Sequence, residues 1–186
     1  ELTQRLGAYA VLTRGEDASL GRKVRSLKDV PKAEKDDAIK KELDGLEKRQ
    51  AFRVVPIQDV DPNAPFLTHV WVIKVRDDDT VKARLCIGGH KQIKGISFWE
   101  ISSPTPRSSS VKLSLAIAAA RRWHIHTADV SQAYVMADLG VKMYMKMPTE
   151  WMSKYPNSCL EVVKSLYGAK QSGRNWHEEV SESIIN

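Results

Sequence analysis

Two runs of β-branched and apolar residues constrain the fold of this 186-residue chain more than any other feature. Residues 68–75 are Thr-His-Val-Trp-Val-Ile-Lys-Val, and residues 80–87 are Thr-Val-Lys-Ala-Arg-Leu-Cys-Ile. Such runs are typical of strands, and the polar segment 76–79 between them predicts an antiparallel hairpin. Lys82 and Arg84 are two residues apart on the second run, so both should project from one face of the hairpin.

Helical patterns precede and follow this hairpin. Residues 33–49 place their apolar side chains on one helical face and their charged side chains on the other, which predicts an amphipathic helix. The Ala- and Leu-rich segment from Val111 to about Trp123 predicts a second helix, with the serines at 108–110 as its N-terminal cap. A third helix is expected over residues 172–185, and further short strands over residues 124–129, 141–147 and 159–163. In the strand at 141–147 a valine and three methionines alternate with polar residues, so this apolar face should lie in the core.

Composition narrows the class of protein. The longest apolar helical stretch, residues 113–120, is far too short to cross a bilayer. The chain begins without Met and without a signal-peptide core, so we expect a piece of a longer intracellular polypeptide. Cys86 and Cys159 are too few for a disulfide framework or a metal cluster, which predicts reduced, buried thiols. We expect an α+β domain over residues 31–186 and a connector over residues 1–30.

The net charge of +6 is concentrated in the middle third of the chain. Residues 64–125 hold 10 basic and 4 acidic side chains, whereas the segments before and after them carry net charges of +1 and −1. A concentrated basic surface attracts nucleic-acid phosphates through steering and counterion release. Charge alone also fits a solvated surface that binds nothing, so the choice between these alternatives depends on motifs.

Two motifs lie in the last third of the chain. Residues 165–176 are Ser-Leu-Tyr-Gly-Ala-Lys-Gln-Ser-Gly-Arg-Asn-Trp, which resembles the SLYGLKQSPRxW segment of copia-type (Ty1/copia) retrotransposon reverse transcriptases. Earlier, Asp129 is followed five residues later by Tyr134, which resembles the first catalytic-carboxylate motif of that family. Residues 38–48 and 81–85 are similar to its A-I-x-x-E-L-x-x-L-E-K helix and Y-K-A-R-L-V strand. In this comparison Ser97 and Gly173 replace the family's usual Asp and Pro.

The resemblance implies an architecture and an activity. The expected fold is the fingers and partial palm of a right-hand polymerase, truncated before the second catalytic motif, an aromatic residue followed by x-Asp-Asp. The implied enzyme is an RNA-directed DNA polymerase that uses Mg²⁺ and deoxynucleoside triphosphates. Its implied partners are an RNA template, a DNA primer and other regions of the parent polyprotein such as integrase and RNase H. The implied location is an intracellular particle in the cytoplasm, the nucleus, or both, without a membrane anchor.

Asp129 is the predicted catalytic carboxylate. An acidic residue after a short apolar strand offers the hard oxygen ligand that Mg²⁺ prefers. Two Mg²⁺ ions activate the hydroxyl and neutralise the leaving oxygens in nucleotidyl transfer. The resemblance implies that Asp129 bridges both ions and that the backbone carbonyl of Val130 adds a ligand. By spacing alone, Asp129 also fits a turn or an N-cap.

The resemblance also assigns binding residues. Nucleotide binding falls to Lys82, Arg84, Tyr134, Tyr167 and Gly168. Tyr134 would lie beneath the sugar and exclude a ribose 2′-hydroxyl, although a core tyrosine fits its spacing equally well. Arginine suits phosphate because its planar fork donates two parallel hydrogen bonds, and glycine lets the backbone approach a ligand. The predicted nucleic-acid contacts are Lys91, Arg107, Lys170 and Arg174.

A rival hypothesis is a catalytically dead retroelement remnant that only binds nucleic acid or persists as a folded fragment. One matched carboxylate cannot hold two Mg²⁺ ions, so we expect the isolated chain to be inactive under either hypothesis. A parent reading frame that continues past Asn186 into an aromatic-x-Asp-Asp motif would favour the enzyme.

Overall fold

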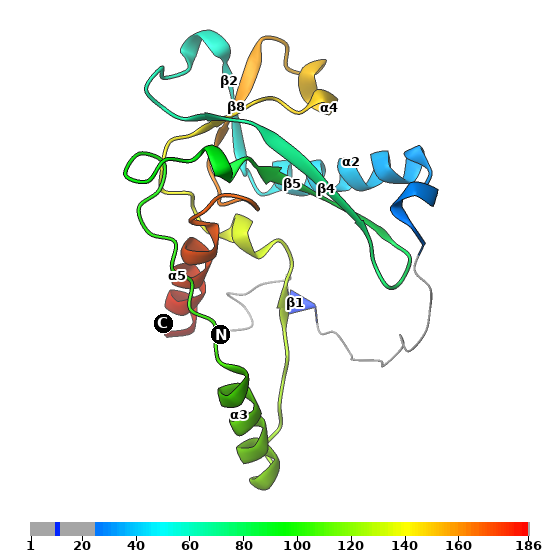
Figure 1. Cartoon of the computed structure of the whole chain (residues 1–186), viewed down its shortest axis with the longest axis vertical. Helices are drawn as coiled ribbons and strands as arrows, with labels where there is room; N and C mark the ends of the chain where they lie inside the picture. The colour runs from blue at the N-terminus through cyan, green and yellow to red at the C-terminus, as the bar shows by residue number, and fades with distance from the viewer. Residues whose placement is uncertain (1–9, 12–24, 186) are drawn as a thin grey trace.

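The predicted hairpin is present in the computed structural model, which describes residues 10–11 and 25–185 (Figure 1). Strands β4 (His69–Val75) and β5 (Val81–Ile87) pair antiparallel, from His69 opposite Ile87 to Val75 opposite Val81. Burial alternates along β5, because Ala83 and Leu85 are buried while Lys82 and Arg84 are half-buried. The expectation that the two cations share a face is therefore confirmed.

Helix α2 (Lys32–Lys48) lies against β5 and confirms the predicted amphipathic helix. Its buried side chains Leu43 and Leu46 join Leu85 of β5 in the main core. Short 3₁₀ turns occur at η2 (Leu27–Asp29), η3 (Ile57–Asp59), η4 (Gly89–Lys91) and η5 (Ala133–Met136). The predicted connector over residues 1–30 lies mostly outside the described residues, so its boundary stays a prediction.

A four-stranded sheet forms the other side of the core. Its order is β2 (Phe52–Pro56), β8 (Ser158–Val162), β7 (Tyr144–Met145) and β3 (Phe66–Leu67). Only the β3–β7 pair is parallel. The strand expected over residues 159–163 is confirmed as β8 to within one residue.

The predicted methionine face lies in the core. Met143, Met145 and Met147 are at most 3% exposed. The strand expected over residues 141–147 is nevertheless shortened to β7, which pairs with both β3 and β8 over Tyr144 and Met145 alone. Helix α4 (Thr149–Met152) follows β7, and helix α5 (Ser172–Ile185) matches the predicted third helix residue for residue.

Residues 101–128 form an arm that projects from the remaining described residues, hereafter the body (Figure 1). Its helix α3 (Ser108–Ala120) begins at the serines that we expected to cap it. Arg107 occupies the N-cap position without a side-chain hydrogen bond, so the predicted serine cap is wrong. Only Ala118 of this helix is buried.

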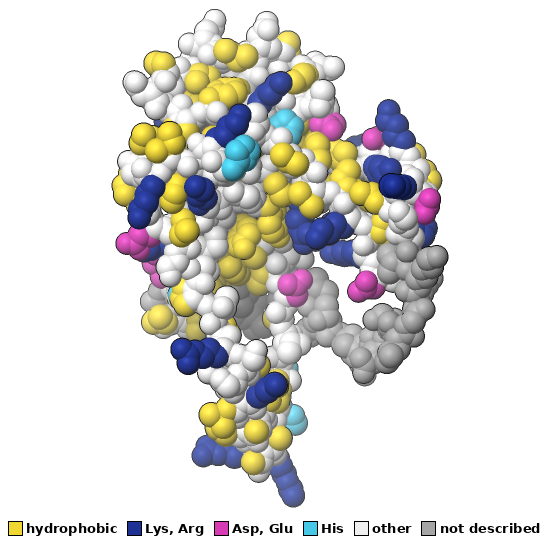
Figure 2. Space-filling model, in the orientation of Figure 1, with side chains coloured by type: hydrophobic (Ala, Val, Ile, Leu, Met, Phe, Trp, Pro, Cys, Tyr) yellow, Lys and Arg dark blue, Asp and Glu magenta, His cyan; other side chains and the backbone are white. Residues whose placement is uncertain are grey.

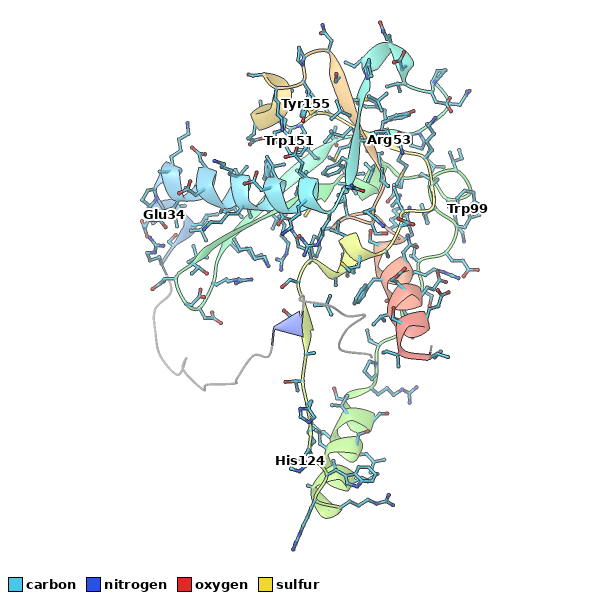
Figure 3. All side chains as sticks on the ribbon, turned by 180° about the vertical axis from the view of Figure 1, so that it is seen from behind. Glu34, Arg53, Trp99, His124, Trp151 and Tyr155 are labelled. Atoms are coloured by element: carbon cyan, nitrogen blue, oxygen red, sulfur yellow. The ribbon has the colours of Figure 1, made fainter. Side chains whose placement is uncertain are left out.

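The strand expected over residues 124–129 is also largely wrong. Only Asp129 enters strand β6 (Asp129–Val130), which pairs antiparallel with β1 (Ala10–Val11). In the described part of the chain no strand pairs with residues 124–128, so they have no ladder partner. Figure 3 shows His124 in this arm, at the opposite end of the molecule from Trp151 of α4 and from Tyr155, which follows that helix.

The two cysteines are unpaired thiols, with Cys159 buried and Cys86 half-buried. Burial raises the pKa of both thiols, which keeps them protonated at neutral pH. Within the described ranges, no helix combines the length and the apolar character that crossing a membrane requires.

Candidate nucleotide-binding site

Three of the five residues predicted to bind nucleotide meet in one stack. The rings of Tyr134 and Tyr167 have centroids 4.9 Å apart and planes inclined by 58°. The guanidinium carbon of Arg84 lies 5.0 Å from the centroid of the Tyr167 ring, a cation–π contact. Within the described chain, the buried Nε of Arg84 has no hydrogen-bond partner. The stack therefore orients a planar cation that retains a free donor.

Gly89 and Gly168 let two backbone segments, residues 87–89 and 167–168, approach each other closely beside this stack. The amide of Ile87 donates a hydrogen bond of 2.8 Å to the carbonyl oxygen of Tyr167. Gly168 has a φ of 89°, and a Cβ there would overlap the carbonyl oxygen of Ile87. A Cβ on Gly89 would likewise overlap the carbonyl oxygen of Gly168. These contacts fix Tyr167 beside the strand that carries Arg84. Sequence analysis did not identify Gly89.

Lys82 lies in a field of opposed charges. Burial lowers the pKa of its ammonium group, and the neighbouring Arg76 and Arg84 lower it further. Glu42 of α2 and Asp129 act in the opposite direction, so both carboxylates lie within electrostatic reach of Lys82. This amine therefore holds its proton less tightly than an exposed lysine does, and it lies within electrostatic reach of Arg84 and of the predicted catalytic carboxylate Asp129.

A cavity of about 240 Å³ opens between α2 and β5 beside Lys82. Its polar lining consists of Lys41, Glu42, Arg76 and Lys82. Figure 2 shows Lys and Arg side chains gathered beside the hollow below the β4–β5 hairpin. Three cations against one carboxylate make this opening electropositive.

Asp129 stands at the start of β6, directly opposite Val11 of β1. Its side chain is exposed, whereas Val130 is half-buried. The Asp129 carboxylate and the Val130 carbonyl are oxygen donors of the kind that Mg²⁺ prefers. Among the residues that the structure describes, no group of three or more His, Cys, Asp or Glu side chains could hold a metal ion. The described residues therefore contain no complete metal site, and the roles of Asp129 and Val130 as magnesium ligands stay predictions.

The four predicted nucleic-acid contacts are dispersed. Lys170 extends its Nζ to 4.6 Å from the centroid of the Phe98 ring. Arg174 forms ion pairs with Glu100 and Glu178. Lys91 in η4 and Arg107 before α3 are exposed. Across residues 25–185, no hydrogen bond, ion pair or ring contact joins any of the four to the tyrosine stack, so their role stays a prediction.

A buried amide network that sequence analysis missed supports the stack. The side-chain Nε2 of Gln92 donates to Oε1 of Gln171 at 2.9 Å and to the carbonyl of Ser97 at 3.1 Å. Its Oε1 accepts a hydrogen bond of 2.8 Å from the amide of Lys170. The network therefore ties the segment after β5 to the turn that carries Tyr167. Ser97, which replaces the family's usual Asp, accepts a hydrogen bond of 2.7 Å from the amide of Ile93.

Comparison with known proteins decides the family. The family model described as Reverse transcriptase (RNA-dependent DNA polymerase) matches residues 51–186. The chain belongs to the copia-type reverse transcriptase family. This confirms the resemblance proposed from the motifs, and the described residues have the mixed helix and strand content expected of such a domain fragment.

Transposon polyproteins are among the relatives of this reverse transcriptase segment. It is 33% identical over 147 residues to the Retrovirus-related Pol polyprotein from transposon TNT 1-94 of Nicotiana tabacum, an alignment that covers 75% of the chain and 11% of that polyprotein. It is 34% identical over 105 residues to the Retrovirus-related Pol polyprotein from transposon RE1 of Arabidopsis thaliana, covering 56% of the chain and 7% of the polyprotein. The chain therefore spans about a tenth or less of the length of these relatives. No solved structure matches it.

Proposed function

We propose that this chain is the fingers and first part of the palm of a polymerase that copies RNA into DNA within a retrotransposon polyprotein. One observation carries the proposal: Arg84, Tyr167 and Tyr134 come from three separate motifs of the family, and they form one continuous stack. Residues assembled from distant motifs into one contact are better explained by a shared ligand than by three unrelated core roles.

Each residue of the stack has a role in the proposed site. Arg84 and Lys82 bind the phosphates of the incoming deoxynucleotide, since a guanidinium fork and an ammonium both match phosphate oxygens. Tyr134 lies beneath the sugar and excludes a 2′-hydroxyl. Tyr167 holds Arg84 in orientation through the cation–π contact, and Gly168 lets the Tyr167 backbone lie against β5.

Asp129 and the carbonyl of Val130 are the proposed Mg²⁺ ligands of this chain. When bound, Mg²⁺ neutralises negative charge on the reacting phosphate. The remaining carboxylates must come from residues outside those described here. Because Asp129 is the one metal carboxylate of the 186-residue chain that matches a family motif, we expect the isolated chain to be inactive. The RNA template and DNA primer contact Lys91, Arg107, Lys170 and Arg174. Integrase and RNase H regions accompany the domain in the parent polyprotein, which acts in a cytoplasmic particle or the nucleus.

The proposal is tested with Tyr134→Val in the full-length parent polyprotein. Removing the ring removes the clash with a 2′-hydroxyl without touching a metal ligand, so ribonucleotide incorporation should rise relative to deoxynucleotide incorporation by about tenfold or more. The measurement is the ratio of kcat/KM values for the two sugars. Tyr155→Val is the matched control, because Tyr155 is also half-buried but packs against Trp151 of α4. An unchanged ratio would make Tyr134 a core residue and place the nucleotide elsewhere.

A second candidate function is a remnant that binds nucleic acid without polymerising it. The incomplete carboxylate set of the described residues favours this alternative. The parent reading frame distinguishes the two, since continuation into an aromatic-x-Asp-Asp motif supports the polymerase and a stop or frameshift supports the remnant.

A further inference from the structure

A glycine in the last turn of α2 has no explanation within the helix itself. Gly45 lies three residues before the end of a 17-residue helix, where glycine is among the least favourable residues. The reason is tertiary: a Cβ at position 45 would lie 3.0 Å from Nε2 and 3.2 Å from Oε1 of Gln132. The side chain of Gln132, 87 positions further along the chain, therefore occupies the space that a side chain at position 45 would need.

Glu42, one turn earlier on α2, supplies the polar partner for this side chain. It is 7% exposed, and its Oε2 accepts a hydrogen bond of 3.0 Å from Nε2 of Gln132. A carboxylate buried to this degree needs a donor to offset its lost hydration. Glu42 and Gly45 together form a notch on α2, hereafter the α2 notch, that accepts the amide group of Gln132.

Gln132 holds a special position in the motif that follows Asp129. Its φ of 54° and ψ of 45° place its backbone in the left-handed region, which residues other than glycine and asparagine rarely adopt. Its carbonyl oxygen accepts a hydrogen bond of 3.0 Å from the amide of Val135, which closes the turn η5 that carries Tyr134. The chain therefore turns at Gln132, between the predicted metal ligand Asp129 and the predicted sugar-contacting ring of Tyr134.

We propose that the α2 notch is a positioning device: by holding Gln132 in its left-handed conformation, it sets where Tyr134 lies relative to Asp129. The catalytic consequence rests on the proposed polymerase function, whereas the structural consequence does not. Glu42 and Gln132 touch neither substrate nor metal in this proposal, and they act through the turn. Glu42 also lies within electrostatic reach of Lys82, so a role as counter-charge to that lysine is the competing explanation.

Hydrogen exchange on the 186-residue chain tests the structural step. The Val135 amide reports the turn directly, because its acceptor is the Gln132 carbonyl. Glu42→Leu removes the acceptor and Gln132→Ala removes the side chain that it holds, so each should speed exchange at Val135 by about tenfold or more. Glu42→Gln keeps an acceptor oxygen and should remain near wild type. Asp44→Leu, an exposed position between the notch residues, is the control.

The outcomes separate the competing explanations. If Glu42→Gln speeds exchange as much as Glu42→Leu, the charge of Glu42 matters and the counter-charge explanation replaces the notch. If Glu42→Leu fails to fold, Gln132→Ala still decides, because it leaves α2 intact. Unchanged exchange at Val135 in a folded Gln132→Ala variant overturns the proposal.

The full-length parent tests the catalytic step. Glu42→Leu should lower kcat more than it raises the KM for deoxynucleotide, and it should shift the sugar ratio toward ribonucleotide. Glu42→Gln should leave kcat and the sugar ratio near their wild-type values. If the wild-type parent does not polymerise, the proposed function fails while the exchange experiment still judges the notch. If the parent is active and Glu42→Leu changes neither kcat nor the sugar ratio, the notch only stabilises the fold and its positioning role is wrong.

Discussion

The body and the arm of this molecule contain similar apolar side chains, but these side chains are buried in the core of the body and exposed in the arm. Leu46 in the body is 1% exposed, whereas Leu113 in the arm is 62% exposed. Figure 2 shows hydrophobic side chains on the surface of α3 at the end of the arm. Leucine content therefore predicts that a segment will be helical, but it does not predict whether the helix finds a neighbour.

The two regions also divide the proposed chemistry. The stack of Arg84, Tyr167 and Tyr134 belongs to the body. It is held by the close backbone contacts at Gly89 and Gly168 and by the buried side-chain amides of Gln92 and Gln171. Asp129 stands where the arm returns to the body, and its strand has two residues. Function and stability should therefore respond differently to substitution in the two regions.

The largest effect is expected from Asp129→Asn in the full-length parent. The change removes one charged oxygen ligand of Mg²⁺, so primer extension on an RNA template should fall by roughly a thousandfold or more. Because the side chain is exposed, the free energy of unfolding should change by less than about 0.5 kcal/mol. Loss of function without loss of stability would set this position apart from the core of the body.

Glu179→Gln on the exposed face of α5 is the control for the same change of charge. It should leave primer extension unchanged. Polymerisation that persists in Asp129→Asn, or Asp129-dependent synthesis by the isolated 186-residue chain, would show that the catalytic carboxylates have been misassigned.

A pair of leucine truncations measures the difference in packing directly. Leu46→Ala leaves a cavity in the body and should lower the free energy of unfolding by about 2–5 kcal/mol. Leu113→Ala removes an exposed side chain and should cost less than about 0.5 kcal/mol. Urea denaturation of the chain provides both values. Equal costs would mean that the arm is packed in solution and that the contrast with the body is wrong.

Local patterns predicted the elements of the body well. The hairpin, α2, α5 and the buried methionine face follow from periodicity, because the spacing of apolar residues within one element determines which face is buried. The predictions for residues 108–110 and 124–128 failed for a different reason. The position of a cap depends on where the helix begins, and a strand forms only where a neighbouring strand pairs with it. The sequence of the segment itself determines neither the first residue of the helix nor the presence of a pairing strand.

The residues of the candidate site also divide into those that the sequence predicted and those that it did not. The tyrosines and Arg84 were predicted because family motifs mark them. Glu42, Gln132 and Gln92 were not assigned a role, because their hydrogen bonds join residues 90 or 79 positions apart in the sequence. Such pairs have no local signature, and only the glycine at position 45, inside α2, offered a hint that another segment approaches this helix.

Cations of the body and the arm can be compared by binding to an RNA–DNA hybrid. Changing Lys82 and Arg84 together to Ala should weaken binding and reduce the slope of log affinity against log salt by about two, if each contacts a phosphate. Changing Arg121 and Arg122 of the arm to Ala removes the same charge from exposed positions and should alter the slope less. Equal changes would show that the +6 charge acts without a defined site, as on a solvated basic surface.

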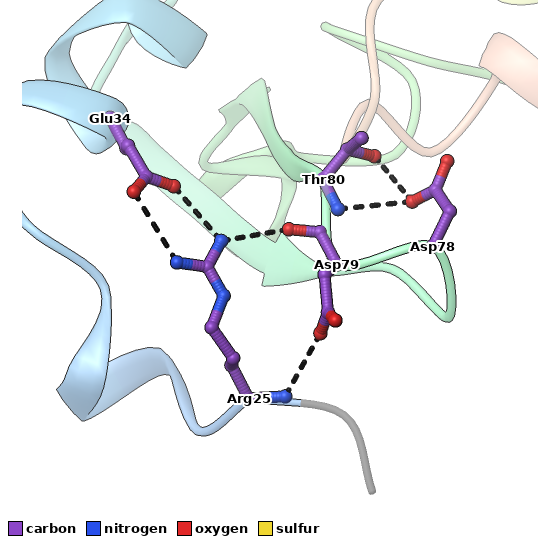
Figure 4. Close-up of polar contacts among 5 residues, drawn as sticks. All are labelled: Arg25, Glu34, Asp78, Asp79 and Thr80. Carbon is purple, nitrogen blue, oxygen red and sulfur yellow. Dashed lines mark hydrogen bonds and ion pairs between the residues drawn. The ribbon is translucent and has the colours of Figure 1, made fainter. Parts of the chain in front are cut away.

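The smallest effect is expected at the tip of the hairpin, where the body has polar contacts instead of a core. Figure 4 shows the Arg25 guanidinium donating hydrogen bonds to both carboxylate oxygens of Glu34, at 3.3 and 2.9 Å, and to the carbonyl of Asp79 at 2.8 Å. The hydrogen bond from Arg25 lowers the pKa of Glu34, and its counterpart raises the pKa of Arg25. These exposed contacts join the turn of the hairpin to the start of α2.

Arg25→Gln should therefore cause a small loss of stability with a defined pH dependence. A carboxylate whose pKa is lowered by folding stabilises the protein fully above the ordinary glutamate pKa, and this contribution is lost as the pH falls through the lowered value. The difference between wild type and Arg25→Gln should accordingly be constant near neutral pH and shrink in acid to the contribution of the hydrogen bond to the Asp79 carbonyl, as measured by urea denaturation across a pH series. Lys28→Gln, which removes the same charge from a nearby exposed lysine, is the control. A difference that persists unchanged in acid would mean that the guanidinium acts through the Asp79 carbonyl alone, and the ion pair with Glu34 would then contribute nothing to holding the hairpin tip.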